Sequence, residues 1–512
     1  MTDNNLSFSK LRHGRRYVPL MAVYILFLFL SLFATGCADR PQNAERVSRI
    51  PRIFPDYAGV TVPAEIAPLN FSVLDGNGIA ERVDVSVKGG KGGELHVNGS
   101  TADFDIDDWY ELTAQNAGGR LAVSVCAKID GRWVEYDDFF IDVSPYPLGQ
   151  WGLTYRRIAP GYEVYSKMGI YQRDLSNFDE FPIIENTMTD GQCYNCHTSN
   201  RTDPATSVFH VRGKHGGTMI SKDGNCTLLA ANNDELGGSM VYPYWHPAGR
   251  YCAFSTNQTR QGFHISGDKR LEVFDLSSDI LVYDTEKNEI LTDTLLNTKA
   301  WSENSPSFSP DGKWLYFTTC LQQQYPLDHK KEQYNLCRIA FDAESCRFGD
   351  RVDTLFNAVE KGKSVSWPRP SYDGRYLLFT LSDYGYFSIW HKESDQWLLD
   401  TATGEARPLD EINSDEADSF HNWSDNSRWI VFTSRRHDGL YSHLYIAGID
   451  DNGNFTKPFL LPQKNPLEYY KQSLYSFNTP DFTRSKVEVD TGRIIDLIMS
   501  DERVATKMQV AR

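Results

Sequence analysis

The sequence predicts an all-β protein, in which a small N-terminal β-sandwich is followed by a β-propeller of six expected blades. Two observations carry this prediction. Between residues 56 and 148, short runs alternate between apolar and polar residues and are separated by glycine-rich turns, which is typical of antiparallel strands. From residue 215 onward a strand-turn-strand unit recurs, and repeats of this kind are typical of propeller blades.

The composition excludes several classes of protein. The chain has 512 residues, of which 40% are hydrophobic, 13% aromatic and 23% charged. Aromatic residues at this density require a buried core, so a disordered chain and a fibre are excluded. Only one long apolar run is present, which excludes a polytopic membrane protein. The net charge is −16 and there is no basic stripe, so binding to nucleic acid is not expected.

The first 36 residues have the features of an export signal peptide. Four basic residues are followed by an apolar run over 17–33 and by Ala34-Thr35-Gly36 before Cys37. This ending resembles the bacterial lipoprotein signal, in which that cysteine is acylated. We therefore expect a protein of the bacterial cell envelope, periplasmic or at the outer membrane, held by a lipid anchor at Cys37. An uncleaved single-span anchor is the alternative.

Three segments precede the propeller. Residues 37–55 contain three prolines and no periodicity, which is typical of a tether. Residues 56–148 are predicted to form an immunoglobulin-like β-sandwich, because runs such as 82–88 and 121–126 alternate strictly. This domain contains no paired catalytic groups, so no chemistry is assigned to it. Residues 149–214 are predicted to be an aromatic-rich linker.

The repeat within residues 215–512 supplies the predicted blades. Its clearest copy is Ser-Pro-Asp-Gly-Lys at 309–313, followed by the apolar strand 314–318. Asp-Gly provides the positive-φ turn of a hairpin, and the flanking apolar residues pair across it. After four copies a second hairpin follows, so each unit has four strands. Five inner hairpins are clear. A sixth could be completed by strands around Tyr475 to Phe482 or by the segment before residue 214, so five to seven blades remain open.

This pattern resembles the TolB-like (WD40-like) six-bladed β-propeller family over roughly residues 215–485, with 309–317 as its most specific part. The resemblance implies a platform with a central channel, in a family whose members range from scaffolds to hydrolases. A serine hydrolase would need a Gly-x-Ser-x-Gly nucleophile elbow, and the sequence has none.

One sharp chemical motif, Cys193-Tyr-Asn-Cys196-His197, lies in the predicted linker. Two thiols three residues apart can each add to a vinyl group of one haem, and the histidine that follows then binds the iron. The motif therefore predicts one covalent haem c, and covalent attachment agrees with an exported chain. A structural zinc site, a thioredoxin-like redox pair and a short-loop disulfide are the alternatives.

The second axial ligand of such a haem is open. His210 is ranked first, followed by His215 and Met188, because all three lie close to the motif in sequence. Arg212 is the expected partner of a haem propionate, since its planar fork suits a carboxylate. Two further histidines begin predicted inner strands and are candidates for the channel: His246 and His421.

The motif, the export signal and the propeller together predict a function. The first hypothesis is an envelope-anchored c-type cytochrome lipoprotein that transfers electrons to or from a redox or envelope protein docked on the propeller. The second is a haem enzyme with an open distal site that acts on a small molecule. The third is a TolB-like binding scaffold with structural haem or none. Whether the protein is an enzyme is left open at this point.

Overall fold

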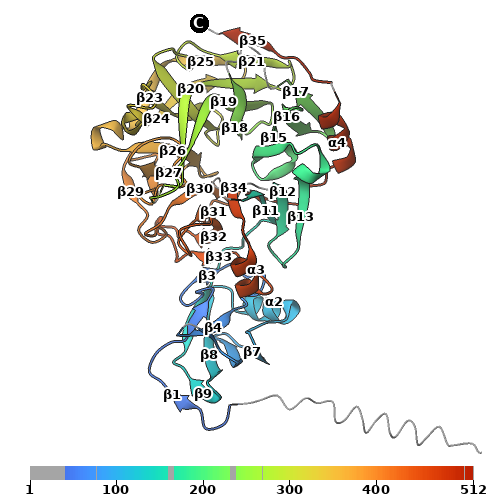
Figure 1. The fold of residues 1–512 in the computed structure, drawn as a ribbon, viewed down its shortest axis with the longest axis vertical. Coiled ribbons are helices and arrows are strands. Elements are labelled where there is room, and N and C mark those ends of the chain that lie inside the picture. The colour runs from blue at the N-terminus through green and yellow to red at the C-terminus, as the bar shows by residue number, and fades with distance from the viewer. Residues whose placement is uncertain are drawn as a thin grey trace, which may run out of the picture.

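A computed structural model describes residues 41–76, 78–159, 167–230, 238–267, 269–500 and 502–510. The predicted signal peptide, the acylation site Cys37 and the first residues of the tether lie outside this part. The regular secondary structure of the described chain is mostly β-strand, so the predicted all-β class is confirmed. The blades are arranged in a ring, and the N-terminal domain projects from one side of the ring (Figure 1). We call the centre of the ring, toward which the inner strands face, the channel.

The N-terminal domain is a β-sandwich with one helix. Its larger sheet has the order β1-β9-β8-β10-β3, with β6 beside β8 and β7 beside β6, and its smaller sheet has the order β2-β4-β5. In β6 the predicted alternation is confirmed, because Val83, Val85 and Val87 are buried. The elements are β1 (Glu45–Arg46), β2 (Arg52–Phe54), β3 (Thr61–Val62), β4 (Ser72–Asp75), β5 (Gly78–Ile79), β6 (Arg82–Gly89), β7 (Glu94–Gly99), α2 (Ile106–Gln115), β8 (Gly119–Ile129), β9 (Arg132–Glu135) and β10 (Phe139–Val143).

Six antiparallel sheets form the blades, and the innermost strands of neighbouring blades contact one another around the whole ring. Blades 1 to 3 are β14 (Cys193–Asn200), β15 (Asp203–Arg212), β16 (Gly217–Lys222) and β17 (Asn225–Leu229); β18 (Ser239–Trp245), β19 (Tyr251–Phe263), β20 (Leu271–Asp284) and β21 (Glu289–Thr292); and β22 (Trp301–Phe308), β23 (Trp314–Leu321), β24 (Asn335–Asp342) and β25 (Arg347–Phe356). Blades 4 to 6 are β26 (Ser364–Pro370), β27 (Tyr376–Ser382), β28 (Asp395–Asp400) and β29 (Ala406–Pro408); β30 (Asp418–Trp423), β31 (Trp429–Ser434), β32 (His443–Gly448) and β33 (Phe459–Leu460); and β34 (Ser476–Thr483), β11 (Gly152–Ile158), β12 (Gly169–Asp174) and β13 (Glu180–Glu185).

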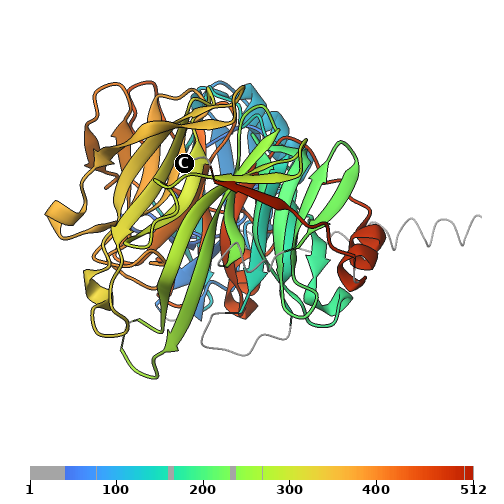
Figure 2. The same cartoon turned by 90° about the horizontal axis from the view of Figure 1, so that it is seen from above.

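Blade 6 closes the ring with strands from both ends of the propeller sequence. Its inner strand β34 pairs antiparallel with β11, which lies more than 300 residues earlier in the chain. The last strand, β35 (Lys507–Val510), adds in parallel to β21 at the outer edge of blade 2 (Figure 2). The remaining helical elements are η1 (Asn186–Met188), η2 (His329–Lys331), η3 (Val359–Lys361), α3 (Pro466–Gln472) and α4 (Thr491–Met499).

Here the structure differs from the predicted linker. Residues 149–214 contain β11, β12 and β13 of blade 6 and the first two strands of blade 1. The aromatic residues of this segment pack inside the propeller: Tyr155 and Tyr171, for example, are buried in the core that blade 6 shares with the sandwich. The Asp190-Gly191 turn in this segment lies between β13 of blade 6 and β14 of blade 1, and the inner partner of β11 is supplied by the far end of the chain.

The inner strands share one irregularity. Each inner strand bulges at one residue with a positive φ of 47° to 55°, where the pairing with the second strand shifts register. The six bulge residues are Cys196, Tyr242, Ser305, Trp367, Phe420 and Thr479. The residues that follow them are His197, Pro243, Pro306, Pro368, His421 and Pro480. Four blades therefore have proline at the position where blades 1 and 5 have histidine.

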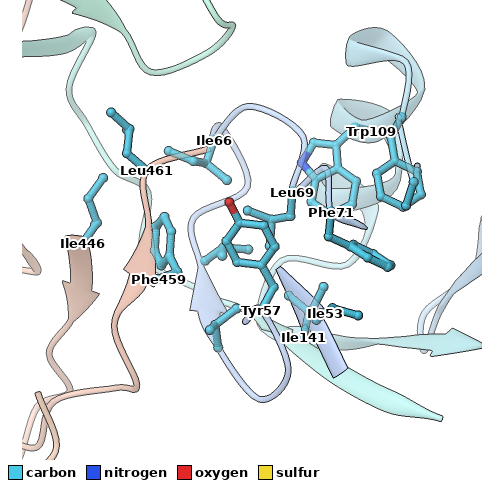
Figure 3. Close-up of a cluster of buried hydrophobic side chains, with 14 of the residues drawn as sticks. Ile53, Tyr57, Ile66, Leu69, Phe71, Trp109, Ile141, Ile446, Phe459 and Leu461 are labelled. Atoms are coloured by element: carbon cyan, nitrogen blue, oxygen red, sulfur yellow. The ribbon is translucent and has the colours of Figure 1, made fainter. Parts of the chain in front are cut away.

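The sandwich and blade 5 share one hydrophobic core. Tyr57 and Phe71 of the sandwich lie in the same buried cluster as Ile446 and Phe459 of blade 5 (Figure 3). The Tyr57 hydroxyl donates a hydrogen bond to the carbonyl of Leu460, at 3.2 Å. Continuous apolar packing of this kind holds two domains in a fixed arrangement, so the sandwich is a rigid extension of the propeller rim.

Candidate functional site in the propeller channel

Side chains from blades 2 and 4 meet inside the channel. The ring centroid of Tyr242 lies 5.9 Å from that of Trp367 and 5.1 Å from that of Tyr386. The guanidinium carbon of Arg369 lies 4.0 Å from the Trp367 ring centroid and 5.1 Å from that of Tyr244. Blades 2 and 4 are not neighbours, so these contacts are made across the channel. We call Tyr242, Tyr244, Trp367, Arg369 and Tyr386 the channel cluster.

Blade 3, which lies between them, makes this contact sterically possible. At the bulge position, where blade 2 has Tyr242 and blade 4 has Trp367, blade 3 has Ser305. Two residues further on it has Ser307, where the neighbouring blades have Tyr244 and Arg369. Both serines are buried. Their small side chains leave the channel space to the larger residues on either side.

Arg369 is a buried cation. It is 3% exposed and donates one hydrogen bond, from Nη1 to the carbonyl of Pro368 at 2.9 Å. Among the described residues, no carboxylate lies within 4.0 Å of its guanidinium group. Burial therefore lowers the pKa of Arg369. Four of its five N–H donors make no hydrogen bond to the described part of the chain.

Asp481 is the carboxylate whose charge acts on Arg369, but it is engaged elsewhere. It accepts hydrogen bonds from the Thr198 hydroxyl at 3.0 Å and from the Ser199 backbone N–H at 2.9 Å. These bonds join blade 6 to blade 1. Burial raises the pKa of Asp481 to about 6. Asp481 therefore offsets the charge of Arg369 only in part.

A second polar group surrounds Asp275, which is buried on β20. Its carboxylate accepts hydrogen bonds from the side-chain amides of Asn257 and Asn304, each at 3.0 Å. Burial raises the pKa of Asp275 to about 6. Burial, and then the charge of Asp275, raise the pKa of Glu332 to about 8. Tyr334 donates a hydrogen bond to Glu332 at 2.9 Å. At neutral pH the Glu332 carboxyl is therefore mostly protonated, because of its raised pKa, whereas the Asp275 carboxylate is mostly ionised.

Another buried carboxyl gives a prediction about pH. Glu303 on β22 is 2% exposed; its Oε1 accepts from Thr298 at 3.0 Å, and its Oε2 has no partner in the described chain. Burial raises its pKa to about 8. Between the unfolded value near 4.3 and about 8, the folded protein holds a proton that the unfolded chain has lost, so this residue makes stability fall as pH rises through that window.

The substitution Glu303→Gln should remove this fall in stability with rising pH. At pH 8 the variant should unfold with a free energy at least ~1 kcal/mol higher than that of the wild type, and at pH 4.5 the two should be equal. Urea unfolding at both pH values measures the difference. Glu344→Gln, at an exposed position, is the matched control and should change neither value. Equal stability of wild type and Glu303→Gln at pH 8 would contradict the argument.

Two small hollows flank the channel cluster. One hollow lies on the side of the ring that carries the Asp-Gly turns, and the residues that line it include Arg201, Tyr244 and Tyr372. The other lies at the opposite mouth, among the connecting loops, and is lined by Ser366, Trp367, Tyr386, Phe387, Ser388, Ile389, Ser419 and Phe420. Arg369 contacts one aromatic residue from each hollow and so lies between them.

The predicted haem motif lies on the inner strand of blade 1. Cys193 is half-buried, and its sulfur accepts a hydrogen bond from Arg156 at 3.4 Å. Cys196 occupies the bulge, is 4% exposed, and has a pKa raised by burial. Both ring nitrogens of His197 are buried without a partner in the described chain, and burial lowers its pKa to about 4.

This packing does not fit a haem. A porphyrin must reach both sulfurs and the imidazole from one side, whereas Cys196 and the His197 ring nitrogens are enclosed by the blades. Haem c at Cys193 and Cys196 stays a prediction from the sequence motif. Among the described residues, no three His, Cys, Asp or Glu side chains form a group that could hold a metal ion.

The three residues predicted as axial ligands lie in different surroundings, and each makes its own contacts. His210 is buried on β15, and its Nδ1 lies 3.2 Å from the Thr218 hydroxyl, with a pKa lowered to about 3 by burial. The backbone of His215 donates to the Gln192 side chain at 3.1 Å. Met188 packs in the core between blade 1 and α4.

The remaining candidates also lie apart from one another. Arg212 is exposed at the end of β15. His246 is buried against Phe308, with its Nε2 3.2 Å from the carbonyl of Gly312. His421 is fully buried, and neither ring nitrogen has a partner in the described chain. Sequence analysis did not identify Arg369 or Tyr386. A sequence signal for Arg369 does exist. In four blades a proline follows the bulge residue, and the residue after that proline, which is Arg369 in blade 4, faces the channel.

The fold defines the protein as a six-bladed β-propeller with an N-terminal β-sandwich. No family model and no curated protein matches the chain. Similar solved structures include a puromycin-hydrolysing peptidase of Mycobacterium tuberculosis, 12% identical over 68% of this chain and 52% of that one, with a TM-score of 0.36. Oligogalacturonate lyase of Vibrio parahaemolyticus is 11% identical over 56% and 85%, with a TM-score of 0.31. Prolyl oligopeptidase B of Galerina marginata is 13% identical over 57% and 42%, with a TM-score of 0.32.

The chain spans about half the length of the two peptidases it resembles. The prediction of an electron-transfer cytochrome is corrected, because Cys196 and the ring nitrogens of His197, which the haem would need, are enclosed by the blades. The similar solved structures are peptidases and a lyase. The classification as a haem protein and a metal-binding protein is corrected with it, since no group of His, Cys, Asp or Glu side chains among the described residues could hold a metal ion. The physical reason is that the motif is an inner-strand bulge of blade 1, equivalent to the Tyr-Pro and Ser-Pro bulges of the next two blades.

Proposed function

We propose that the propeller is a binding protein for a small carboxylate-bearing ligand, which Arg369 holds in the central channel. The observation that carries this proposal is the buried guanidinium group without an ion pair in the described chain. An unpaired buried charge costs several kcal/mol, so such a group is retained where a ligand supplies the opposite charge.

The surroundings of Arg369 favour a carboxylate. Its planar fork lies over Trp367 and near Tyr244, and arginine stacked in this way presents its N–H donors at the edge of the plane. A carboxylate can accept two parallel hydrogen bonds from that edge. The aromatic residues exclude water, which strengthens the attraction. The charge of Asp481, which acts on Arg369, disfavours a ligand of higher negative charge.

Isothermal titration of the purified protein tests this proposal. Monocarboxylates such as acetate and propionate should bind, and the matched uncharged amides should not, because an amide lacks the negative charge that pairs with the guanidinium. Binding should persist at moderate salt, since a buried pair is weakly screened. Equal binding of acids and amides, or no binding of either, would overturn the proposal.

Export and membrane attachment are part of the same proposal. The supporting observations are the basic segment, the apolar run and the small residues before Cys37. Within the part of the chain that the structure describes, no helix is long and apolar enough to span a membrane. The tether 37–55 would then connect the acylated cysteine to the rigid sandwich and propeller, in the bacterial cell envelope, where a docked envelope protein is the expected partner.

A further inference from the structure

The hairpin of β19 and β20 projects from the ring at the face opposite to the Asp-Gly turns. β19 has 13 residues and β20 has 14, whereas the second and third strands of the other blades have six to ten. The two strands pair as far as Phe263 and Leu271. Figure 2 shows this hairpin extending past the neighbouring strands of the ring. We call residues 260–270 the hairpin tip.

The hairpin tip carries large apolar side chains that face solvent. Ile265 is 99% exposed and Phe263 is 57% exposed. The base of the hairpin is held by blade 4, because Lys269 donates a hydrogen bond to the Glu393 carboxylate at 2.9 Å. The tip is therefore kept away from the propeller surface, where its apolar side chains could have been buried.

A second apolar projection lies beside the hairpin. The blade 3 loop, residues 322–334, packs on β20, with the ring centroids of Tyr325 and Phe274 5.7 Å apart. Leu327 follows Tyr325 by two residues and is 78% exposed. Single exposed apolar residues are common on soluble proteins, but apolar residues grouped on adjoining projections indicate a contact surface.

The same two segments are basic, although the protein as a whole is acidic. Residues 260–270 and 322–331 together contain five Lys or Arg and two Asp, in a chain whose net charge is −16. One of these aspartates, Asp328, forms an ion pair with Lys331 at 2.8 Å, and the other, Asp268, lies outside the described residues. Arg260 and Lys330 are exposed. An apolar surface with basic residues around it is complementary to an anionic partner that has an apolar interior.

We propose that the hairpin tip and the blade 3 loop dock on an anionic lipid surface. Phe263, Ile265 and Leu327 enter the boundary between headgroups and acyl chains, and the basic residues pair with lipid phosphate groups. A bilayer is favoured over a protein partner because these side chains project outward, and a fluid interface accepts projecting side chains without a matching pocket.

This inference goes beyond the proposed function, and it does not require a carboxylate ligand. Export with acylation at Cys37 would bring the chain to a membrane, but one tether leaves the orientation of the propeller free. A second contact through the hairpin fixes that orientation. The face of the ring that carries the Asp-Gly turns is then directed away from the lipid.

Cosedimentation with vesicles tests this inference on the chain from residue 38 to 512, which contains every described element and no acylation site. The chain should bind vesicles of equal parts phosphatidylglycerol and phosphatidylcholine about tenfold more tightly than phosphatidylcholine alone, and added salt should weaken this binding. Arg260→Gln with Lys330→Gln should remove most of the preference for the anionic vesicles. Equal binding to both kinds of vesicle would overturn the inference. Binding to neither would also overturn it, and would favour a protein as the partner of the hairpin tip.

A matched pair of variants tests the apolar part. Phe263→Ser with Ile265→Ser should weaken binding to the anionic vesicles about tenfold and leave Tm unchanged, because both side chains lie in solvent. Ile79→Ser with Phe140→Ser removes the same two residue types from the sandwich, where they are 50% and 45% exposed, and should bind as the wild type does. Wild-type binding by the hairpin variant, or an equal loss in the sandwich variant, would overturn the inference. Vesicle binding by a chain that binds no carboxylate would refute the proposed function alone.

Discussion

Arg369→Met should weaken carboxylate binding by about 100-fold, because a charge-assisted pair of hydrogen bonds is lost and no other cation replaces it in the channel cluster. The free energy of unfolding of the unliganded protein should not fall. Methionine fills a similar volume between Trp367 and Tyr244, and the variant no longer buries an unpaired charge. Isothermal titration measures the first quantity and urea unfolding the second.

Two further variants make the result specific. Arg369→Lys keeps the charge and loses the planar fork, so it should recover only part of the affinity. Arg428→Met is the matched control, because Arg428 also lies over an aromatic ring, that of Tyr146, but at the propeller rim. It should bind carboxylates as the wild type does. Wild-type affinity in Arg369→Met would refute the assignment of the anion site to this residue.

The sequence predicted the blades wherever their hairpins are local. The Asp311-Gly312 turn, for example, connects β22 and β23, and Gly312 has a φ of +72° that few other residues adopt. For blade 6 the sequence offered strands near Tyr475 to Phe482 or the segment before residue 214 as alternatives, and the structure uses both, because β34 pairs with β11 across almost the whole propeller sequence. Local periodicity contains no information about such a partner.

The candidate site was the harder part to predict. The Cys-x-x-Cys-His spacing is a strong signal when those residues lie on an exposed turn, but here the spacing falls on a buried bulge. Arg369 is a single arginine in a strand, and only the three-dimensional ring brings it opposite Tyr244 of a distant blade. Its burial, which is the property that suggests a ligand, is a result of the closed ring.

Removing β34 should prevent the protein from folding. All eight residues of this strand are buried, and it supplies the inner strand of blade 6 and the Asp481 bonds to blade 1. A chain that ends at Tyr475 leaves β11 without its partner and opens the ring between blades 5 and 1. We expect loss of near-UV circular dichroism and of a cooperative urea transition, because an open ring exposes apolar strand faces and unpaired backbone groups.

A shorter truncation distinguishes ring closure from a general effect of shortening the chain. A chain that ends at Ala505 lacks β35, which pairs only with the outer edge of blade 2 and is largely exposed. It keeps Arg503, which donates hydrogen bonds to carbonyls at the end of α4. This variant should unfold cooperatively and at a Tm within a few degrees of the wild type. If the chain ending at Tyr475 also unfolded cooperatively, five blades would be stable as an open array, and closure by β34 would not be what holds Arg369 in the channel.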